Sequence, residues 1–118
     1  MACHEYMVHF ATGGVLMEQK DMATINAVTL LAADADAMVY LVGKTDTVGS
    51  KAANMRLSRQ RADKVHNALV DNGVLPARIV TSYTGKLAPV VATGDQDDEP
   101  LNRVVTITAG KNCPPPKA

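Results

Sequence analysis

A small polar turn joins an apolar strand to a long helix between residues 38 and 72, and this unit most constrains the fold. Residues 38–42 are almost continuously apolar, as expected for a strand buried within a sheet. Residues 50–72 carry one apolar stripe at helical spacing, made by Leu57, Ala62, Val65, Ala68 and Leu69. A buried strand followed by an amphipathic helix indicates an α/β unit, and such units usually bind ligands where the strand ends.

Three polar residues interrupt the apolar stripe of that helix: Asn54, Ser58 and Arg61. Arginine keeps its proton in proteins, and an unpaired buried charge is costly, so Arg61 needs a partner. It could bond the terminal carbonyls of a neighbouring element or pair internally with Asp46. It could instead line a cleft and bind a carboxylate, which its planar head group suits. Spacing alone leaves these interpretations open.

Asp46 lies where the strand ends and just before the helix begins. An aspartate in a Thr-Asp-Thr-x-Gly turn often only caps backbone amides, and Ser50 is a good N-cap for the helix. If Asp46 and Arg61 face one cleft, however, their opposite charges match a zwitterion such as an amino acid. Both interpretations of Asp46 stay open at this point.

The order of the expected elements predicts an α+β fold. Strands are expected at residues 6–10, 38–42, 78–82 and 103–109, and helices at 18–33 and 50–72. In the first helix, the apolar face is expected to hold Met22, Ile25, Val28 or Thr29, and Ala32. Asn72 and Gly73 end the second helix. Residues 85–101 hold prolines and an acidic cluster, which favours a solvated loop. The order β-α-β-α-β-β predicts a two-layer α/β sandwich with both helices on one face of a four-stranded mixed sheet.

Charge and aromatic content exclude several functions. Twelve basic and twelve acidic residues cancel, and no basic block stands out, so we expect no nucleic-acid partner. The absence of Trp and an aromatic content of 3% argue against base-stacking or aromatic sugar platforms. His4, His9 and His66 fall on different elements and form no zinc pattern. We therefore expect no catalytic residues, no metal and no cofactor.

The residues of the Asp46 turn and the following helix belong to a longer sequence pattern. It reads Gly43-x-Thr45-Asp46-x-x-Gly49-Ser50, then Asn54, Leu57-Ser58, Arg61-Ala62, Val65, Leu69, Gly73-Val74 and Asn102-Arg103-x-Val105. This pattern resembles the OmpA-like C-terminal domain over nearly the whole chain. The resemblance implies non-covalent binding of peptidoglycan in the periplasm of Gram-negative bacteria. It also implies the sheet order 1-4-2-3, with the last strand antiparallel to the others.

The resemblance also implies roles for individual residues. Asp46 would take the ammonium of the diaminopimelate in the stem peptide, and Arg61 a carboxylate. The other expected ligand-binding residues are Asn54, Arg103, Thr47 and Gly13, with Asn54 and Arg103 supporting the pocket. One departure stands out, because Phe10 is followed by the small residues of the segment Ala-Thr-Gly-Gly, where the family often carries Asp and a polar residue.

We expect residues 1–110 to form a single OmpA-like domain and residues 111–118 a proline-rich tail or linker. The implied sheet order would bring Cys3 and Cys113 together. A disulfide would suit an oxidising periplasm. Two free thiols at the chain ends are the alternative.

No apolar run approaches the roughly 20 residues of a membrane helix, so we expect no direct membrane insertion by this segment. The first residues do not resemble a secretory signal. Taken literally, this indicates a cytoplasmic chain. With the resemblance, we expect a domain of a longer exported protein, with Met1 added for expression. It would lie in the periplasm, associated with the outer membrane through its parent chain.

Two functions remain. One is a non-catalytic module that anchors a parent protein to the peptidoglycan stem peptide, with Asp46 and Arg61 facing an open cleft and too far apart for a direct bond. The other is a structural or assembly domain acting in homodimerisation, in which these two residues can close on each other as an internal salt bridge.

Overall fold

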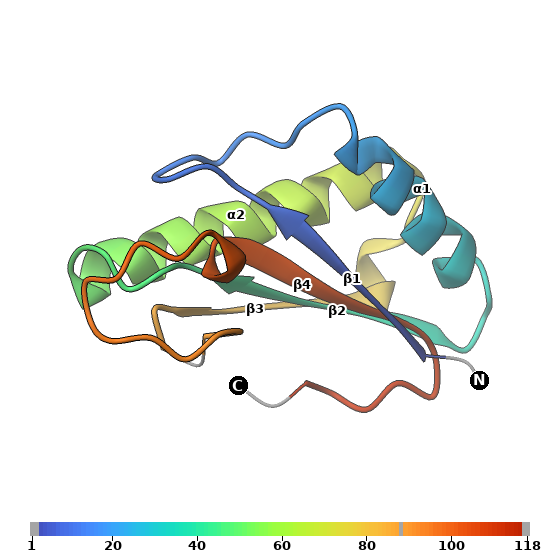
Figure 1. The fold of residues 1–118 in the computed structure, drawn as a ribbon. Helices are drawn as coiled ribbons and strands as arrows, with labels where there is room; N and C mark the ends of the chain where they lie inside the picture. Colours follow the sequence, from blue (N-terminus) through green and yellow to red (C-terminus); the bar gives the residue numbers. More distant parts are fainter. Residues whose placement is uncertain (1–2, 88, 117–118) are drawn as a thin grey trace.

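Four strands form one mixed sheet, and two helices cover one of its faces, in the computed structural model of the chain (Figure 1). The structure describes residues 3–87 and 89–116. The strands are β1 (Cys3–His9), β2 (Ala37–Lys44), β3 (Ile79–Gly85) and β4 (Val104–Lys111), and the helices are α1 (Asp21–Ala32) and α2 (Lys51–Asp71). Single 3-10 turns, Pro76–Arg78 and Pro100–Asn102, precede β3 and β4.

The sheet order is β1-β4-β2-β3, with β2 parallel to β3 and β4 antiparallel to both of its neighbours. This confirms the predicted α+β fold and the order 1-4-2-3. The last strand of the chain therefore lies inside the sheet, between the first two. Met1 and the final two residues of the expected tail lie outside the described residues.

The bounds of β1 and α1 differ from the prediction for identifiable reasons. β1 begins at Cys3, because β4 pairs with it along its whole length, from Cys3 opposite Gly110 to His9 opposite Val104. Helix α1 begins at Asp21. The Asp21 carboxylate accepts a hydrogen bond from the Glu18 amide (2.8 Å), which holds the preceding turn.

The expected core position of Met22 in α1 is wrong. Its side chain is 42% exposed, whereas Ile25 and Val28 are fully buried, as expected. Asp21 is buried instead of Met22 because its carboxylate caps the turn that leads into the helix.

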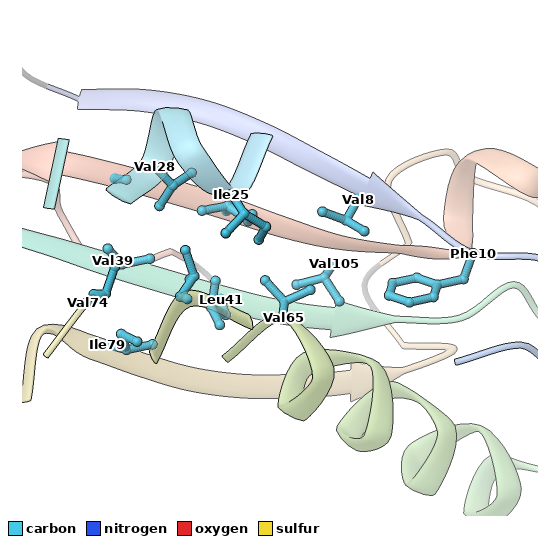
Figure 2. Close-up of a cluster of buried hydrophobic side chains, with 13 residues drawn as sticks. Val8, Phe10, Ile25, Val28, Val39, Leu41, Val65, Val74, Ile79 and Val105 are labelled. Atoms are coloured by element: carbon cyan, nitrogen blue, oxygen red, sulfur yellow. The ribbon is translucent and has the colours of Figure 1, made fainter. Parts of the chain in front are cut away.

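The core lies between the sheet and the two helices, as Figure 2 shows. Alternate residues of the strands point into it, as the period of two in a strand requires. Its fully buried members include Val8, Ile25, Val28, Val39, Leu41, Val65, Leu69, Val105 and Ile107. Each such side chain contributes roughly 1.5–3 kcal/mol through burial, before conformational entropy is subtracted.

Helix α2 begins and ends at the predicted signals. The Ser50 hydroxyl accepts a hydrogen bond from the Ala53 amide (3.1 Å) and caps the first turn. Gly73 follows the helix with a φ of +104°, a conformation that glycine adopts without strain. These caps fix the register of α2 and so determine which of its residues face the sheet.

Close packing between α2 and β2 depends on Gly43. A Cβ atom at Gly43 would lie 2.0 Å from the Ser58 carbonyl oxygen, so only glycine lets the helix backbone approach the strand here. The Ser58 hydroxyl donates to the Met55 carbonyl (2.9 Å) and accepts from the Gly85 amide (2.9 Å). The serine that interrupts the apolar stripe therefore joins α2 to the end of β3.

A disulfide joins Cys3 to Cys113, with their Cα atoms 5.3 Å apart. Cys3 begins β1 and Cys113 follows β4, its antiparallel neighbour, so the sheet order itself brings the thiols together. Of the two alternatives for the cysteines, the disulfide is confirmed. Within residues 3–87 and 89–116, no helix combines the length and the apolar character needed to cross a bilayer.

Candidate functional site

The side chain of Arg61 extends from α2 to the end of β2, where backbone carbonyls from two chain segments surround its guanidinium group. Its Nε donates to the Gly14 carbonyl (2.9 Å), Nη1 to the Lys44 carbonyl (3.1 Å) and Nη2 to the Ala11 carbonyl (3.1 Å). The guanidinium carbon lies 5.3 Å from the centre of the Phe10 ring, within the range of a cation–π contact. The segment after β1 therefore folds over the head group of Arg61.

These contacts match the interpretation in which Arg61 bonds carbonyls of neighbouring segments. Its side chain is completely buried, so the expectation that it faces an open cleft is wrong for this structure. The reason is the segment of residues 10–14, whose carbonyls satisfy the guanidinium and cover it. Burial lowers the pKa of Arg61 to about 10; the negative charge of Asp46 opposes this shift and the positive charge of Arg103 adds to it. Arg61 remains protonated at neutral pH.

Asp46 pairs with Arg103. Arg103 Nη1 lies 3.2 Å from Asp46 Oδ2, and both side chains are largely buried. The other carboxylate oxygen, Oδ1, accepts a hydrogen bond from the Val48 amide (3.3 Å), so Asp46 also caps its own turn. Arg103 Nε donates to the Phe10 carbonyl (3.2 Å). Among the ion pairs of the described residues, Asp46 is matched with Arg103 and none joins it directly to Arg61.

Asn54 supports the turn from the first part of α2. Its Nδ2 donates to the Val48 carbonyl (2.7 Å), and the residue is 5% exposed. The amide side chain therefore holds the backbone that presents Asp46. Asn54, Ser58 and Arg61 are all buried, as their positions in the apolar stripe predicted.

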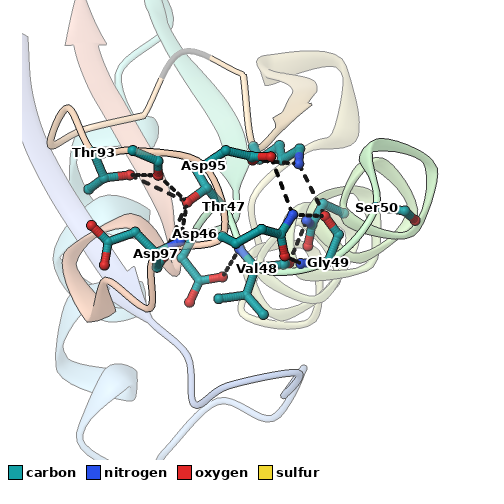
Figure 3. A network of polar contacts seen from close by, with 12 residues as sticks. Asp46, Thr47, Val48, Gly49, Ser50, Thr93, Asp95 and Asp97 are labelled. Carbon is teal, nitrogen blue, oxygen red and sulfur yellow. Dashed lines mark hydrogen bonds and ion pairs between the residues drawn. The ribbon is translucent and has the colours of Figure 1, made fainter.

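Thr47 connects the turn to the long segment before β4 (Figure 3). Its hydroxyl lies 2.8 Å from the Gly94 carbonyl and accepts a hydrogen bond from the Asp97 amide (2.8 Å). The Gln96 amide donates to the Thr47 carbonyl (3.0 Å). Thr47, which is 7% exposed, therefore holds residues 94–97 of the loop before β4 against the Asp46 turn.

Sequence reasoning described residues 85–101 only as a solvated loop and missed the contacts that Lys86 and residues 94–97 make with the Asp46 turn. The Gln96 side chain accepts from the Gly49 amide (2.9 Å) and donates to the Gly49 carbonyl (3.0 Å). Lys86 Nζ also donates to the Gly49 carbonyl (3.1 Å) and pairs with Asp95 (2.8 Å). The side chains of Asp95, Asp97 and Asp98 are exposed, but the backbone of residues 94–97 folds back onto the Asp46 turn. No pattern in the sequence signals these contacts, because most involve main-chain atoms.

Gly13 lies in the segment that covers Arg61, but unlike the other predicted site residues it has no side chain to offer a ligand. It has a φ of +65° and is exposed, and a Cβ atom there would meet nothing within 4 Å. Ala11, two residues before it, and Gly14, which follows it, supply carbonyls that bind Arg61, so Gly13 belongs to the turn that covers the guanidinium. The structure thus brings Asp46, Asn54, Arg61, Thr47 and Arg103 to one end of the sheet, with Gly13 at their rim.

The charges at this end of the sheet could bind a ligand that carries both signs. Asp46 offers a carboxylate, and Arg61 and Arg103 offer guanidinium groups, which bind carboxylates in a fixed planar geometry. The described residues contain no group of three or more His, Cys, Asp or Glu side chains arranged to hold a metal ion.

Known proteins are similar to this chain in sequence. The probable lipoprotein YiaD of Escherichia coli is 41% identical over 70 residues, which are 59% of this chain and 32% of that protein. The peptidoglycan-binding protein ArfA of Mycobacterium bovis is 34% identical over 101 residues, 85% of this chain and 31% of that protein. The chain thus spans about a third of the length of these relatives.

Solved structures show the same fold. The peptidoglycan-associated lipoprotein from Burkholderia pseudomallei superposes with a TM-score of 0.79 at 24% identity, covering 87% of this chain and 88% of that one. A model of the OmpA family matches residues 9–103, which include every predicted ligand-binding residue. The chain therefore belongs to the OmpA family.

Proposed function

We propose that this domain is a non-catalytic module that anchors a longer envelope protein to peptidoglycan by binding the diaminopimelate of the stem peptide. Asp46 takes the ammonium group and Arg61 a carboxylate. The supporting residues are Asn54, Arg103, Thr47 and Gly13. The parent chain lies in the periplasm and is associated with the outer membrane.

One observation carries this proposal: Arg61 and Asp46 place opposite charges at one end of the sheet, where Arg61 bonds the carbonyl of Lys44, two residues before Asp46, and the negative charge of Asp46 acts on Arg61. The free end of diaminopimelate carries an ammonium and a carboxylate on the same carbon, so it presents both charges at short range. Relatives point the same way, since ArfA is a peptidoglycan-binding protein and the Burkholderia protein is a peptidoglycan-associated lipoprotein.

Access to Arg61 requires a local movement of residues 10–14. A carboxylate is a stronger acceptor for a guanidinium than a neutral carbonyl, so it can replace the carbonyl of Ala11 or Gly14. The three carbonyl contacts use three of the five N–H donors of the guanidinium. The Lys44 carbonyl belongs to β2 and can stay in place while the segment after β1 moves.

Titration with a diaminopimelate-containing stem peptide, followed by calorimetry or NMR, tests the proposal. We expect saturable binding by the wild type. Asp46→Asn should weaken it at least about tenfold, because a charge-assisted hydrogen bond contributes roughly 1.5–3 kcal/mol. The same peptide with lysine in place of diaminopimelate lacks one carboxylate and should bind more weakly to the wild type.

Asp63→Asn is the matched control, because it makes the same chemical change on the exposed face of α2. It should leave the affinity unchanged. No binding by a folded wild type, or equal losses in the two variants, would contradict the proposed role of Asp46. Thermal unfolding of each variant separates lost binding from lost structure.

A second candidate function is a structural or assembly domain that forms homodimers. The observations that favour it are the complete burial of Arg61 and the pairing of Asp46 with Arg103. Sedimentation equilibrium of the domain, together with the stem-peptide titration, separates the two functions. A stable dimer without peptide binding would support assembly, whereas a monomer that binds the peptide would support the anchor.

A further inference from the structure

Arg103 bridges two carboxylates, one buried and one exposed. Its Nη1 lies 3.2 Å from Asp46 Oδ2 and 2.5 Å from Asp98 Oδ1. The side chains of Asp46 and Arg103 are 7% and 12% exposed, whereas that of Asp98 is 68% exposed. The three residues therefore form a chain of alternating charge that runs from the interior to the surface.

Asp98 adds a second carboxylate to the pair that Arg103 makes with Asp46. Arg61, by contrast, bonds backbone carbonyls and no carboxylate directly in the ion pairs of the described residues. Asp98 belongs to the loop before β4, which is fastened over the turn through Thr47. Its carboxylate occupies the outer side of Arg103, where a carboxylate of an entering ligand would otherwise be attracted.

We propose that Asp98 is a specificity-determining residue that neutralises Arg103 and so reduces discrimination between stem peptides with a free and an amidated diaminopimelate carboxyl. This inference rests on the proposed function, because it concerns which form of the same ligand is accepted. With Asp98 in place, Arg103 lies between two carboxylates. Without it, Asp46 alone is shared between Arg103 and the ligand ammonium, so Arg103 attracts a free ligand carboxylate more strongly and disfavours the more positive amide.

The test is a pair of titrations with two peptides that differ only in that carboxyl group, free or amidated. The measured quantity is the ratio of the two dissociation constants. In Asp98→Asn, the preference for the free carboxylate should rise by about two- to fivefold, the range expected for an ion pair with an exposed partner. This increase should shrink at 0.5 M salt, where the screening length is roughly 4 Å.

Asp97→Asn is the matched control. Asp97 is exposed and adjacent, and it contacts Thr47 through its backbone amide and carbonyl, which the substitution leaves in place. Its ratio should stay at the wild-type value. A purely structural role of Asp98 would weaken both peptides equally and leave the ratio unchanged.

The titrations have three possible outcomes, which separate the role of Asp98 from the proposed function itself. A rise in the ratio confined to Asp98→Asn supports the inference. A wild type that binds the peptides, with the same ratio in Asp98→Asn or an equal rise in Asp97→Asn, overturns the inference and leaves the proposed function standing. A folded wild type that binds neither peptide overturns the proposed function, and this inference with it.

Discussion

Arg61 is held by the shape of its head group as well as by its charge. The carbonyls of Ala11, Gly14 and Lys44 approach it from separate segments. A lysine ammonium keeps the charge but is a compact donor on a flexible stem, so it reaches fewer of them. We expect Arg61→Lys to lower the free energy of unfolding by about 2 kcal/mol, the cost of one or two buried carbonyls left unpaired.

Urea denaturation measures this difference, and Arg59→Lys provides the matched control. Arg59 lies on the same helix, is exposed and pairs with Asp63 at 3.9 Å. Its replacement should change stability by no more than about 0.5 kcal/mol. Equal effects of the two substitutions would show that the carbonyl cage around Arg61 is not what stabilises this end of the sheet.

The burial of Arg61 could be predicted from the sequence, but its partners could not. The break in the apolar stripe placed Asn54, Ser58 and Arg61 on the buried face, and all three are buried. The groups that satisfy Arg61 are main-chain carbonyls, which any residue type can supply. Asp98 was visible only as part of an acidic loop, because its pairing with Arg103 depends on how that loop folds back.

At the level of elements, the approach of α2 to β2 depends on one glycine. A Cβ atom at Gly43 would lie 2.0 Å from the Ser58 carbonyl oxygen and 3.1 Å from the Ala62 side chain. The first of these contacts is with helix backbone, so α2 would have to move. We expect Gly43→Ala to destabilise the domain by about 3 kcal/mol, at the upper end of typical overpacking costs.

Gly94→Ala tests whether this cost comes from the close approach or from the loss of any glycine. A Cβ atom at Gly94 would meet nothing within 4 Å, so this variant should be as stable as the wild type. Thermal unfolding of both variants makes the comparison. A Gly43→Ala domain with wild-type stability would mean that α2 can shift at little cost, and the position of Arg61 would then be less fixed than the packing indicates.

At the scale of the whole molecule, the sequence predicted the element order and both helix caps of α2, since hydrophobic periodicity and turn residues signal these directly. The strand order came from the family resemblance. For Arg61 the sequence left both backbone carbonyls and an open cleft as interpretations, because a charged residue on a buried helix face indicates only that a partner exists; the structure shows the carbonyls. Whether that partner is a ligand or the covering segment is decided by packing between parts of the chain that are far apart in sequence.

The disulfide and the candidate site lie at opposite ends of β4. Arg103 precedes the strand and Cys113 follows it, and eight residues of extended chain span roughly 26 Å. Cys3 and Cys113 are 110 positions apart, so their link strongly restricts the unfolded chain. We expect Cys3→Ser with Cys113→Ser to lower the free energy of unfolding by about 2–4 kcal/mol.

Stem-peptide affinity, measured at a temperature where both forms are folded, should not change in the double serine variant, because the disulfide and Arg103 lie at opposite ends of β4. Reduction of the wild type, followed in urea, should reproduce the loss of stability. A weaker affinity in the folded double variant would show that strain or motion passes along β4 from the joined ends to Arg103. The disulfide between Cys3 and Cys113 would then also help to hold the proposed binding residues in place at the other end of the sheet.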